Sequence, residues 1–124
     1  MNTSRTQFIT LRLQSLIDSV PDVLGAAVVS TDGLSIASVL QPPIDEDRVA
    51  AMSAAMLSLG ERISSELGRG VMEQVYIKGT EGYALLVAVG PQAVLTIISG
   101  GEAKLGMLLL ELRMAVADLG PLID

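Results

Sequence analysis

A long helical stretch without charge in its middle constrains the fold of this chain most. Residues 45–68 read DEDRVAAMSAAMLSLGERISSELG, and the twelve positions between Arg48 and Glu61 carry no charged side chain. At 1.5 Å per residue, a helix over this stretch is about 36 Å long. More than three turns without a charge leave no ionic face in any direction, so we expect this helix to be covered on more than one side.

Two stripes of this helix differ in side-chain size and therefore in the partner that we expect. Large apolar residues recur at spacings of three and four, which predicts packing on the chain's own core. They are Val49, Met52, Met56, Leu59, Ile63 and Leu67. A neighbouring stripe holds the small residues Ala51, Ala55 and Ser58, which would let another backbone come close. A second copy of this helix is the simplest partner, because most soluble oligomers are symmetric. The alternative is that alanine stands there only as a good helix former.

The composition indicates one soluble domain over residues 1–124 with an aliphatic core. Half of the residues are apolar, but only three are aromatic. A chain of 124 residues is long enough to bury a hydrophobic core of its own. No apolar run reaches the length of a membrane span, and the N-terminus lacks the apolar segment of a signal peptide. We therefore expect a cytoplasmic protein.

The residue types exclude most chemistry. Cysteine and histidine are absent, so thiolate and imidazole catalysis and the commonest zinc ligands are absent too. The net charge of −6 disfavours nucleic acid as a partner. The cluster 45–47 is predicted to cap the long helix, and the Gly-Gly pair at 100–101 lacks the spacing of a phosphate-binding loop. We predict no catalytic residue, no metal site and no cofactor.

The remaining periodicities complete an α/β (α+β) fold with the order α-β-β-α-β-β-β-α. A helix with one apolar face precedes Pro21, and Asp32-Gly33 between two apolar runs predicts a hairpin. Three further strand-like runs follow the long helix, and a last leucine-rich helix is expected to end at Gly120-Pro121. These elements fit a five-stranded, mostly antiparallel sheet between the long helix on one face and the two terminal helices on the other.

Two strands are expected at the sheet edges because their sequences are more polar. They are the runs 34–40 and 71–78. Alternation in the second run places Met72, Gln74, Tyr76 and Lys78 on one side. Its free backbone groups could pair with the same strand of a second copy, next to the small-residue stripe.

Several segments in the same order resemble the Roadblock family, the relatives of the dynein roadblock light chains. They are VPDVLGAAVV from position 20, STDGLSIAS from 30, DEDRVAAM from 45, LSLGER from 57, GYALLV from 82 and KLGMLLLE from 104. The resemblance extends over about residues 11–119. It implies a non-enzymatic homodimer whose sheets join edge to edge, whose long helices pair, and which binds a small Ras-like GTPase. Bacterial and archaeal members include Mgl-type regulators of such GTPases.

The resemblance also suggests which residues carry these contacts. The dimer interface would include Ala51, Ala55, Ser58, Met72, Gln74 and Tyr76. The docking surface for the GTPase would lie on the outward side of the long helix, with Asp47, Arg48, Arg62 and Ser65 as candidates. An arginine there could contact a switch region or act as an arginine finger, or it could simply be solvated and paired with Glu61 or Glu66.

Two other functions stay open. The chain could be a structural scaffold subunit in a signalling assembly without contact to a GTPase. It could also be a small-ligand sensor or an enzyme, although an apolar pocket here would have few polar anchors. The chain lacks the C-terminal segment that some polarity regulators carry. We therefore expect binding of a GTPase, and stimulation of GTP hydrolysis on that partner stays open.

Overall fold

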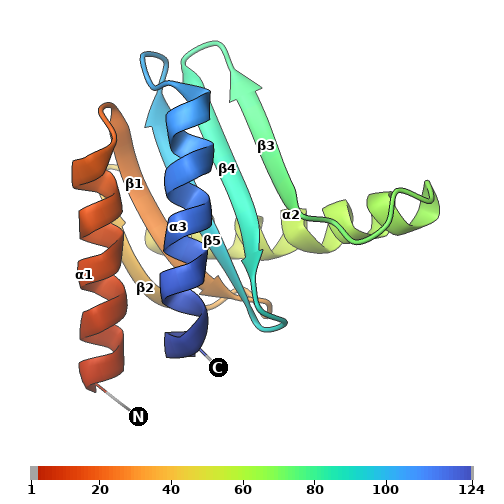
Figure 1. The fold of residues 1–124 in the computed structure, drawn as a ribbon, viewed down its shortest axis with the longest axis horizontal. Coiled ribbons are helices and arrows are strands. Elements are labelled where there is room, and N and C mark those ends of the chain that lie inside the picture. The colour runs from red at the N-terminus through yellow and green to blue at the C-terminus, as the bar shows by residue number, and fades with distance from the viewer. Residues whose placement is uncertain (1–2, 124) are drawn as a thin grey trace.

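The computed structural model describes residues 3–123 and confirms the expected order of elements (Figure 1). Three helices and five strands alternate as α-β-β-α-β-β-β-α. They are α1 (Thr3–Ser19), β1 (Val23–Ser30), β2 (Ser35–Leu40), α2 (Glu46–Glu66), β3 (Gln74–Gly79), β4 (Gly82–Val89), β5 (Ala93–Gly100) and α3 (Leu105–Ile123).

The strands form one antiparallel sheet in the order β2-β1-β5-β4-β3. The uncharged strand β5 lies in the centre, and the more polar β2 and β3 form the two edges, as predicted. Hairpin turns join β1 to β2, β3 to β4 and β4 to β5, so most of the sheet is a meander. Only β1, which pairs with β5, brings together strands that are distant in the sequence.

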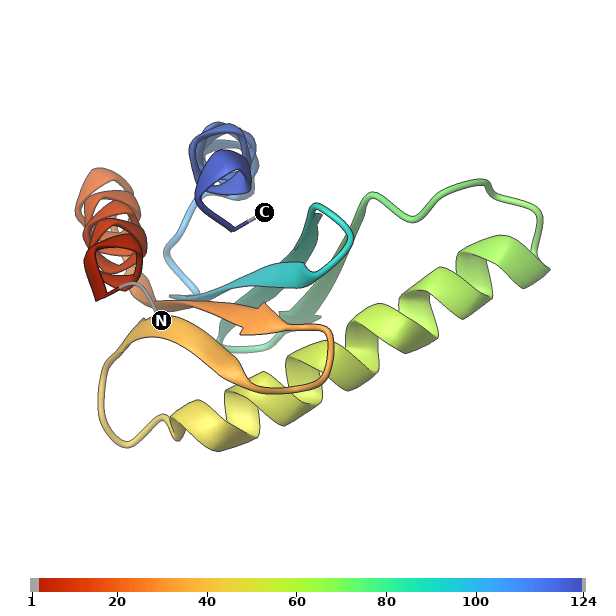
Figure 2. The ribbon, with the colours of Figure 1, turned by 90° about the horizontal axis from the view of Figure 1, so that it is seen from below.

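The sheet separates two helical layers (Figure 2). Helices α1 and α3 cover one face, and α2 crosses the other at a slant. The larger core lies under α1 and α3, where Ile9, Leu13, Leu108 and Leu112 pack against Leu95 and other strand residues. The α2 face holds two smaller clusters. The α2 side is therefore the less completely covered side of the sheet.

The edge strand β3 is shorter than predicted. It begins at Gln74, whereas we expected a strand from residue 71. Met72 leaves the extended pattern and packs with Val75 against the cluster around Leu57 and Leu86. Burial of that side chain beneath α2 thus replaces the first three strand positions, and Val71 is left 90% exposed.

Helix α3 is longer than predicted. Gly120 and Pro121 were expected to end it, but the helix continues to Ile123. Ile123 is buried and Leu122 packs against the same core cluster. The contacts of the last turn therefore outweigh the energetic cost of Pro121 within the helix. This proline lies close to the end of the helix, so few later residues are affected by it.

The prediction for the buried face of α2 was wrong for most of the stripe of large apolar residues. The helix buries Val49 of that stripe, but its other buried residues, Ala50, Ser53 and Leu57, lie outside the stripe. Within that stripe, four side chains are about half exposed or more, namely Met52, Leu59, Ile63 and Leu67. The reason lies in the sheet, whose face under α2 includes bulkier residues such as Val29 and Val94, so small helix residues give the closest approach.

None of the described helices has the length and apolar character needed to cross a membrane.

Candidate protein-binding surface on helix α2

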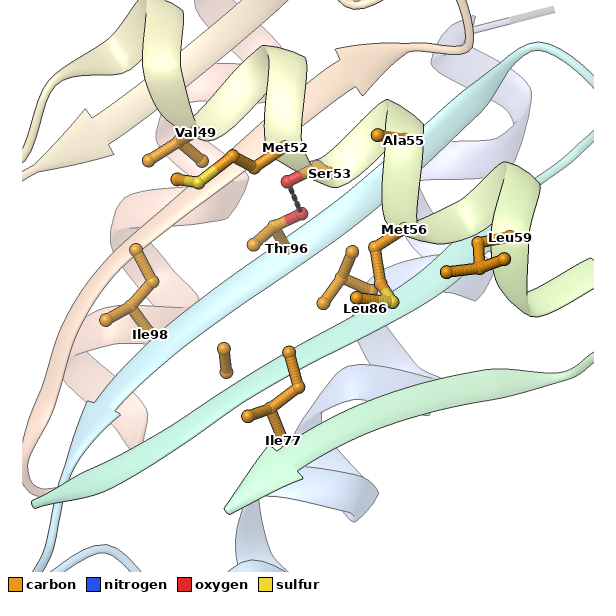
Figure 3. Close-up of a pocket in the computed structure, with 11 residues that line it drawn as sticks. Val49, Met52, Ser53, Ala55, Met56, Leu59, Ile77, Leu86, Thr96 and Ile98 are labelled. Atoms are coloured by element: carbon orange, nitrogen blue, oxygen red, sulfur yellow. Dashed lines mark hydrogen bonds between the residues drawn. The ribbon is translucent and has the colours of Figure 1, made fainter. Parts of the chain in front are cut away.

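An apolar groove lies between α2 and the β3–β4 side of the sheet (Figure 3). Its volume is about 430 Å³, and one wall is the flank of α2 that carries Met52, Ala55 and Leu59. The other residues come from α2 and from three strands. They are Val49, Ser53, Met56, Ile77, Ala84, Leu86, Thr96 and Ile98. Such a surface is suited to another apolar surface, because it offers few groups that could orient a polar ligand.

The two polar side chains of the groove satisfy each other. The hydroxyls of Ser53 on α2 and Thr96 on β5 lie 2.8 Å apart, and both residues are buried. A buried hydroxyl without a partner would be costly, so this bond explains how α2 places a serine on the sheet. Because the two hydroxyls bond to each other, they add little polar character to the groove.

The crest of α2 points away from the sheet. At 100° per residue, Ala51, Ala55, Ser58 and Arg62 lie within about 60° of the direction opposite the buried residues. All four are exposed. The small-residue stripe is therefore not covered by the chain itself.

The four candidates for GTPase docking are all exposed on α2. Arg48 and Arg62 lie near the crest, whereas Asp47 and Ser65 lie on the flank away from the groove. Arg62 donates to the Glu66 carboxylate at 2.7 Å, one turn further along the helix. An exposed pair of this kind contributes little to stability, so Arg62 remains available to a partner.

The candidates for a dimer interface do not share one face. Only Ala55 of the small-residue stripe lines the groove. Met72 packs beneath α2, whereas Gln74 and Tyr76 pair with Val87 and Leu85, whose side chains face the α1 and α3 layer. Gln74 and Tyr76 nevertheless lie on the free edge strand, where they are exposed.

A carboxylate joins the start of α2 to the edge strand β2. Glu46 accepts hydrogen bonds from the hydroxyls of Ser38 and Ser35, both at 2.7 Å. The bond from Ser38, followed by that from Ser35, lowers the pKa of Glu46, while desolvation opposes the shift. Asp45 caps the same helix by accepting from the Asp47 amide, as predicted.

Sequence reasoning missed the two serines and the strand residues of the groove. Ser35 and Ser38 are both on one strand, but the bulge between Val28 and Val29 shifts the register and turns both toward Glu46. Ile77, Ala84 and Ile98 were read only as sheet residues. Their alternation would have placed them on the α2 face, but their exposure depends on the slant of the helix. Among the described residues, no group of three acidic, histidine or cysteine side chains could hold a metal ion.

Comparison with known proteins identifies the family. Residues 9–99, well over half of the chain, match the Roadblock/LC7 domain. The chain belongs to the Roadblock/LC7 family. The protein MJ0714 of Methanocaldococcus jannaschii is 34% identical to it over 110 residues, which cover 83% of this chain and 92% of that protein.

Solved structures share this Roadblock fold. The Roadblock/LC7 domain from Streptomyces avermitilis has a TM-score of 0.85 and 26% identity, with 90% of this chain and 94% of that chain covered. Myxococcus xanthus MglB has a TM-score of 0.88 and 20% identity over 100% of this chain and 96% of that chain. At that identity, the similarity to MglB is one of fold.

Proposed function

We propose that this Roadblock domain is a cytoplasmic, non-enzymatic homodimer that binds a small Ras-like GTPase and modulates or localises it. The observation that carries the proposal is the uncovered state of α2. A helix in the middle of the chain exposes a crest of small residues, an apolar groove and half-exposed large side chains at the same time. An exposed apolar surface of this kind is typical of a protein–protein binding site.

Homodimerisation is supported by the position of these surfaces. The groove lies directly beside β3, and β3 is an edge strand with exposed residues. A two-fold axis next to β3 would continue the sheet and bring the grooves of two copies together. Ala55 would lie in the contact between helices, with Ala51 and Ser58 at its outer margin and Met72, Gln74 and Tyr76 at the strand edge.

Binding of a GTPase is supported by the crest of α2 and by membership of the Roadblock/LC7 family. In a dimer with paired helices, the two crests would form one platform. Arg48 and Arg62 would provide cations at this platform, with Asp47 and Ser65 on its margin. We expect Arg62 to contact a switch region of the GTPase. The Arg62 side chain would then exchange its bond with the Glu66 carboxylate for a contact with the GTPase.

The alternative function is a structural scaffold subunit that does not touch a GTPase. The same crest could bind a kinase or another scaffold protein, because an apolar surface with few charges is not specific for one class of partner.

A pull-down with the purified chain separates the two functions. We expect Ras-like GTPases from the same organism to be retained, and more strongly when loaded with a GTP analogue than with GDP. Recovery of kinases or scaffold subunits without any GTPase would contradict the proposal and favour the alternative.

The variant Arg62→Ala tests the docking surface within the same assay. We expect it to weaken GTPase binding about tenfold, equivalent to about 1.4 kcal/mol. Arg113→Ala, which removes an exposed arginine from α3, is the matched control and should bind normally. Equal affinities of the two variants would remove Arg62 from the docking surface.

A further inference from the structure

The outer edge of β2 presents open backbone groups at two residues. The amide of Gln41 donates to the carbonyl of Leu24 at 3.3 Å, and this pair continues the register of β1 with β2. Hydrogen-bonded pairs alternate along an antiparallel ladder, so the backbone groups of Val39 also face β1. Ser38 and Leu40 therefore turn their amides and carbonyls outward, and β2 is the last strand on that side of the sheet.

This edge has little of the usual protection against pairing with another strand. Natural edge strands are commonly protected by charged residues, prolines or bulges. The sequence SIASVL of β2 contains neither a charge nor a proline. One bulge shifts the register between Val28 and Val29, but the pairing from Ala37 to Leu40 is regular. The regular part of β2 is therefore a suitable template for one more strand.

A carboxylate at this edge has one oxygen without a hydrogen bond. The hydroxyls of Ser35 and Ser38 both donate to Oε2 of Glu46, and these two bonds hold the carboxylate beside the strand. None of the described residues donates a hydrogen bond to Oε1 of Glu46. Glu46 is exposed, and so is the neighbouring Asp47 on the flank of α2 away from the groove. The charge at this edge is therefore negative and complements a cation on a partner.

Helices α1 and α2 lie on opposite sides of β2, so an added strand would meet different side chains on each side (Figure 2). Ser38 and Leu40 point toward α2, where Glu46 lies. Ile36 and Val39 are partly buried against the core on the α1 side. Residues that oppose each other in neighbouring strands point to the same side of the sheet. A segment that fits this edge therefore alternates basic residues on the α2 side with apolar residues on the α1 side.

We propose that β2 binds an extended segment of a partner protein as a sixth strand, and that a lysine or arginine of this segment binds Oε1 of Glu46. Backbone hydrogen bonds to Ser38 and Leu40 give such an added strand its affinity, and the alternating side chains give it specificity. A hydrogen bond from a cation to a carboxylate is stronger than one between neutral groups. β2 is the edge opposite β3, so this site does not depend on the proposed homodimer.

A peptide that alternates lysine with valine tests the added strand. The probe is the acetylated and amidated peptide TVKVKVT, titrated into the isotope-labelled chain and followed by NMR. We expect saturable shifts of the β2 amides and slower hydrogen exchange at Ser38 and Leu40. The amide of Val39 should change little in exchange, because it already bonds to β1.

A peptide with methylated lysine amides is the matched control, because it keeps the charge but loses backbone donors. It should bind about tenfold more weakly, or weaker still. Equal affinity of the two peptides would overturn the added strand. Unprotected amides of Ser38 and Leu40 at millimolar TVKVKVT, or protection of β3 in their place, would overturn it as well.

The variant Glu46→Gln tests the contact with the basic side chain. It removes the charge but keeps an oxygen that can accept from Ser35 and Ser38. We expect it to bind TVKVKVT about fivefold more weakly and to bind the neutral peptide TVSVSVT as wild type does, because only the ionic contact is lost. Glu61→Gln makes the same change on the same helix, about 22 Å further along, and should bind both peptides normally. Equal affinities of the two variants for TVKVKVT would overturn the role of Glu46 and the basic character of the segment.

Discussion

Glu46 connects α2 to the edge strand β2 through one exposed carboxylate. Its position at the start of α2 favours a negative charge, and the hydroxyls of Ser38 and Ser35 hold that charge beside β2. Both hydroxyls stabilise the ionised form, which is why the pKa of Glu46 is lowered. A folded-state pKa below the unfolded one means that this contribution to stability is present above the unfolded pKa and is lost as the pH falls through the folded pKa.

This sign gives a prediction for the double variant Ser35→Ala/Ser38→Ala. At pH 7 we expect it to be destabilised by at most about 1 kcal/mol, because the carboxylate is exposed and its hydrogen bonds compete with water. The deficit should shrink as the pH falls below the ordinary glutamate pKa of 4.5. Urea unfolding of both proteins at pH 7 and pH 3 measures it.

Ser15→Ala is a control for that comparison, since it removes an exposed hydroxyl from α1. Its effect on the free energy of unfolding should be the same at both pH values. A deficit of the double variant that stays constant between pH 7 and pH 3 would show that the serines act without the charge of Glu46.

Helix α2 makes a different kind of contact on each of its sides. Small and medium residues such as Ala50 and Ser53 pack on the sheet, the large stripe with Met52 and Leu59 faces the groove, and Arg62 marks the crest. A helix whose sides are mostly apolar or neutral needs to be covered by more than one neighbouring element or protein. In this molecule the sheet covers only one side of α2.

Ala55→Glu tests the helix contact, because Ala55 borders the groove on the flank that we expect to meet the partner helix. An unpaired charge in that contact should cost several kcal/mol and weaken the dimer at least a hundredfold. Light scattering across a dilution series measures the change. Ala117→Glu makes the same substitution at an exposed position of α3 and should leave the dimer intact. An Ala55→Glu variant that still dimerises like wild type would exclude this flank.

The elements could be predicted from the sequence because their signals are local. Asp32-Gly33 marks the first hairpin, Asp45 caps α2, and the charge-free strands are central. The buried face of α2 could not be predicted in this way. The spacing of Met52 and Leu59 fits a core stripe equally well when the surface that covers it belongs to another molecule.

The predictions for the end of α3 and the start of β3 were wrong for a related reason. Pro121 and Val71 were read by their local preferences, but burial of Ile123 and Met72 decides both boundaries. Tertiary contacts of this kind override propensity and leave no periodic signal.

The whole molecule is unequal on its two sides. One face of the sheet has two helices and the main core, whereas the other has one slanted helix that extends past the sheet edge (Figure 2). The proposed second copy would correct this imbalance, and the paired crests would then give a GTPase a surface that one copy lacks. Dimerisation is therefore the central claim, since the platform for a GTPase depends on it.

Sedimentation equilibrium of the wild-type chain tests this claim most directly. We predict a species of twice the chain mass of 13.0 kDa at micromolar concentration, with dissociation only on strong dilution. A single species of 13.0 kDa that persists to high concentration would contradict the account.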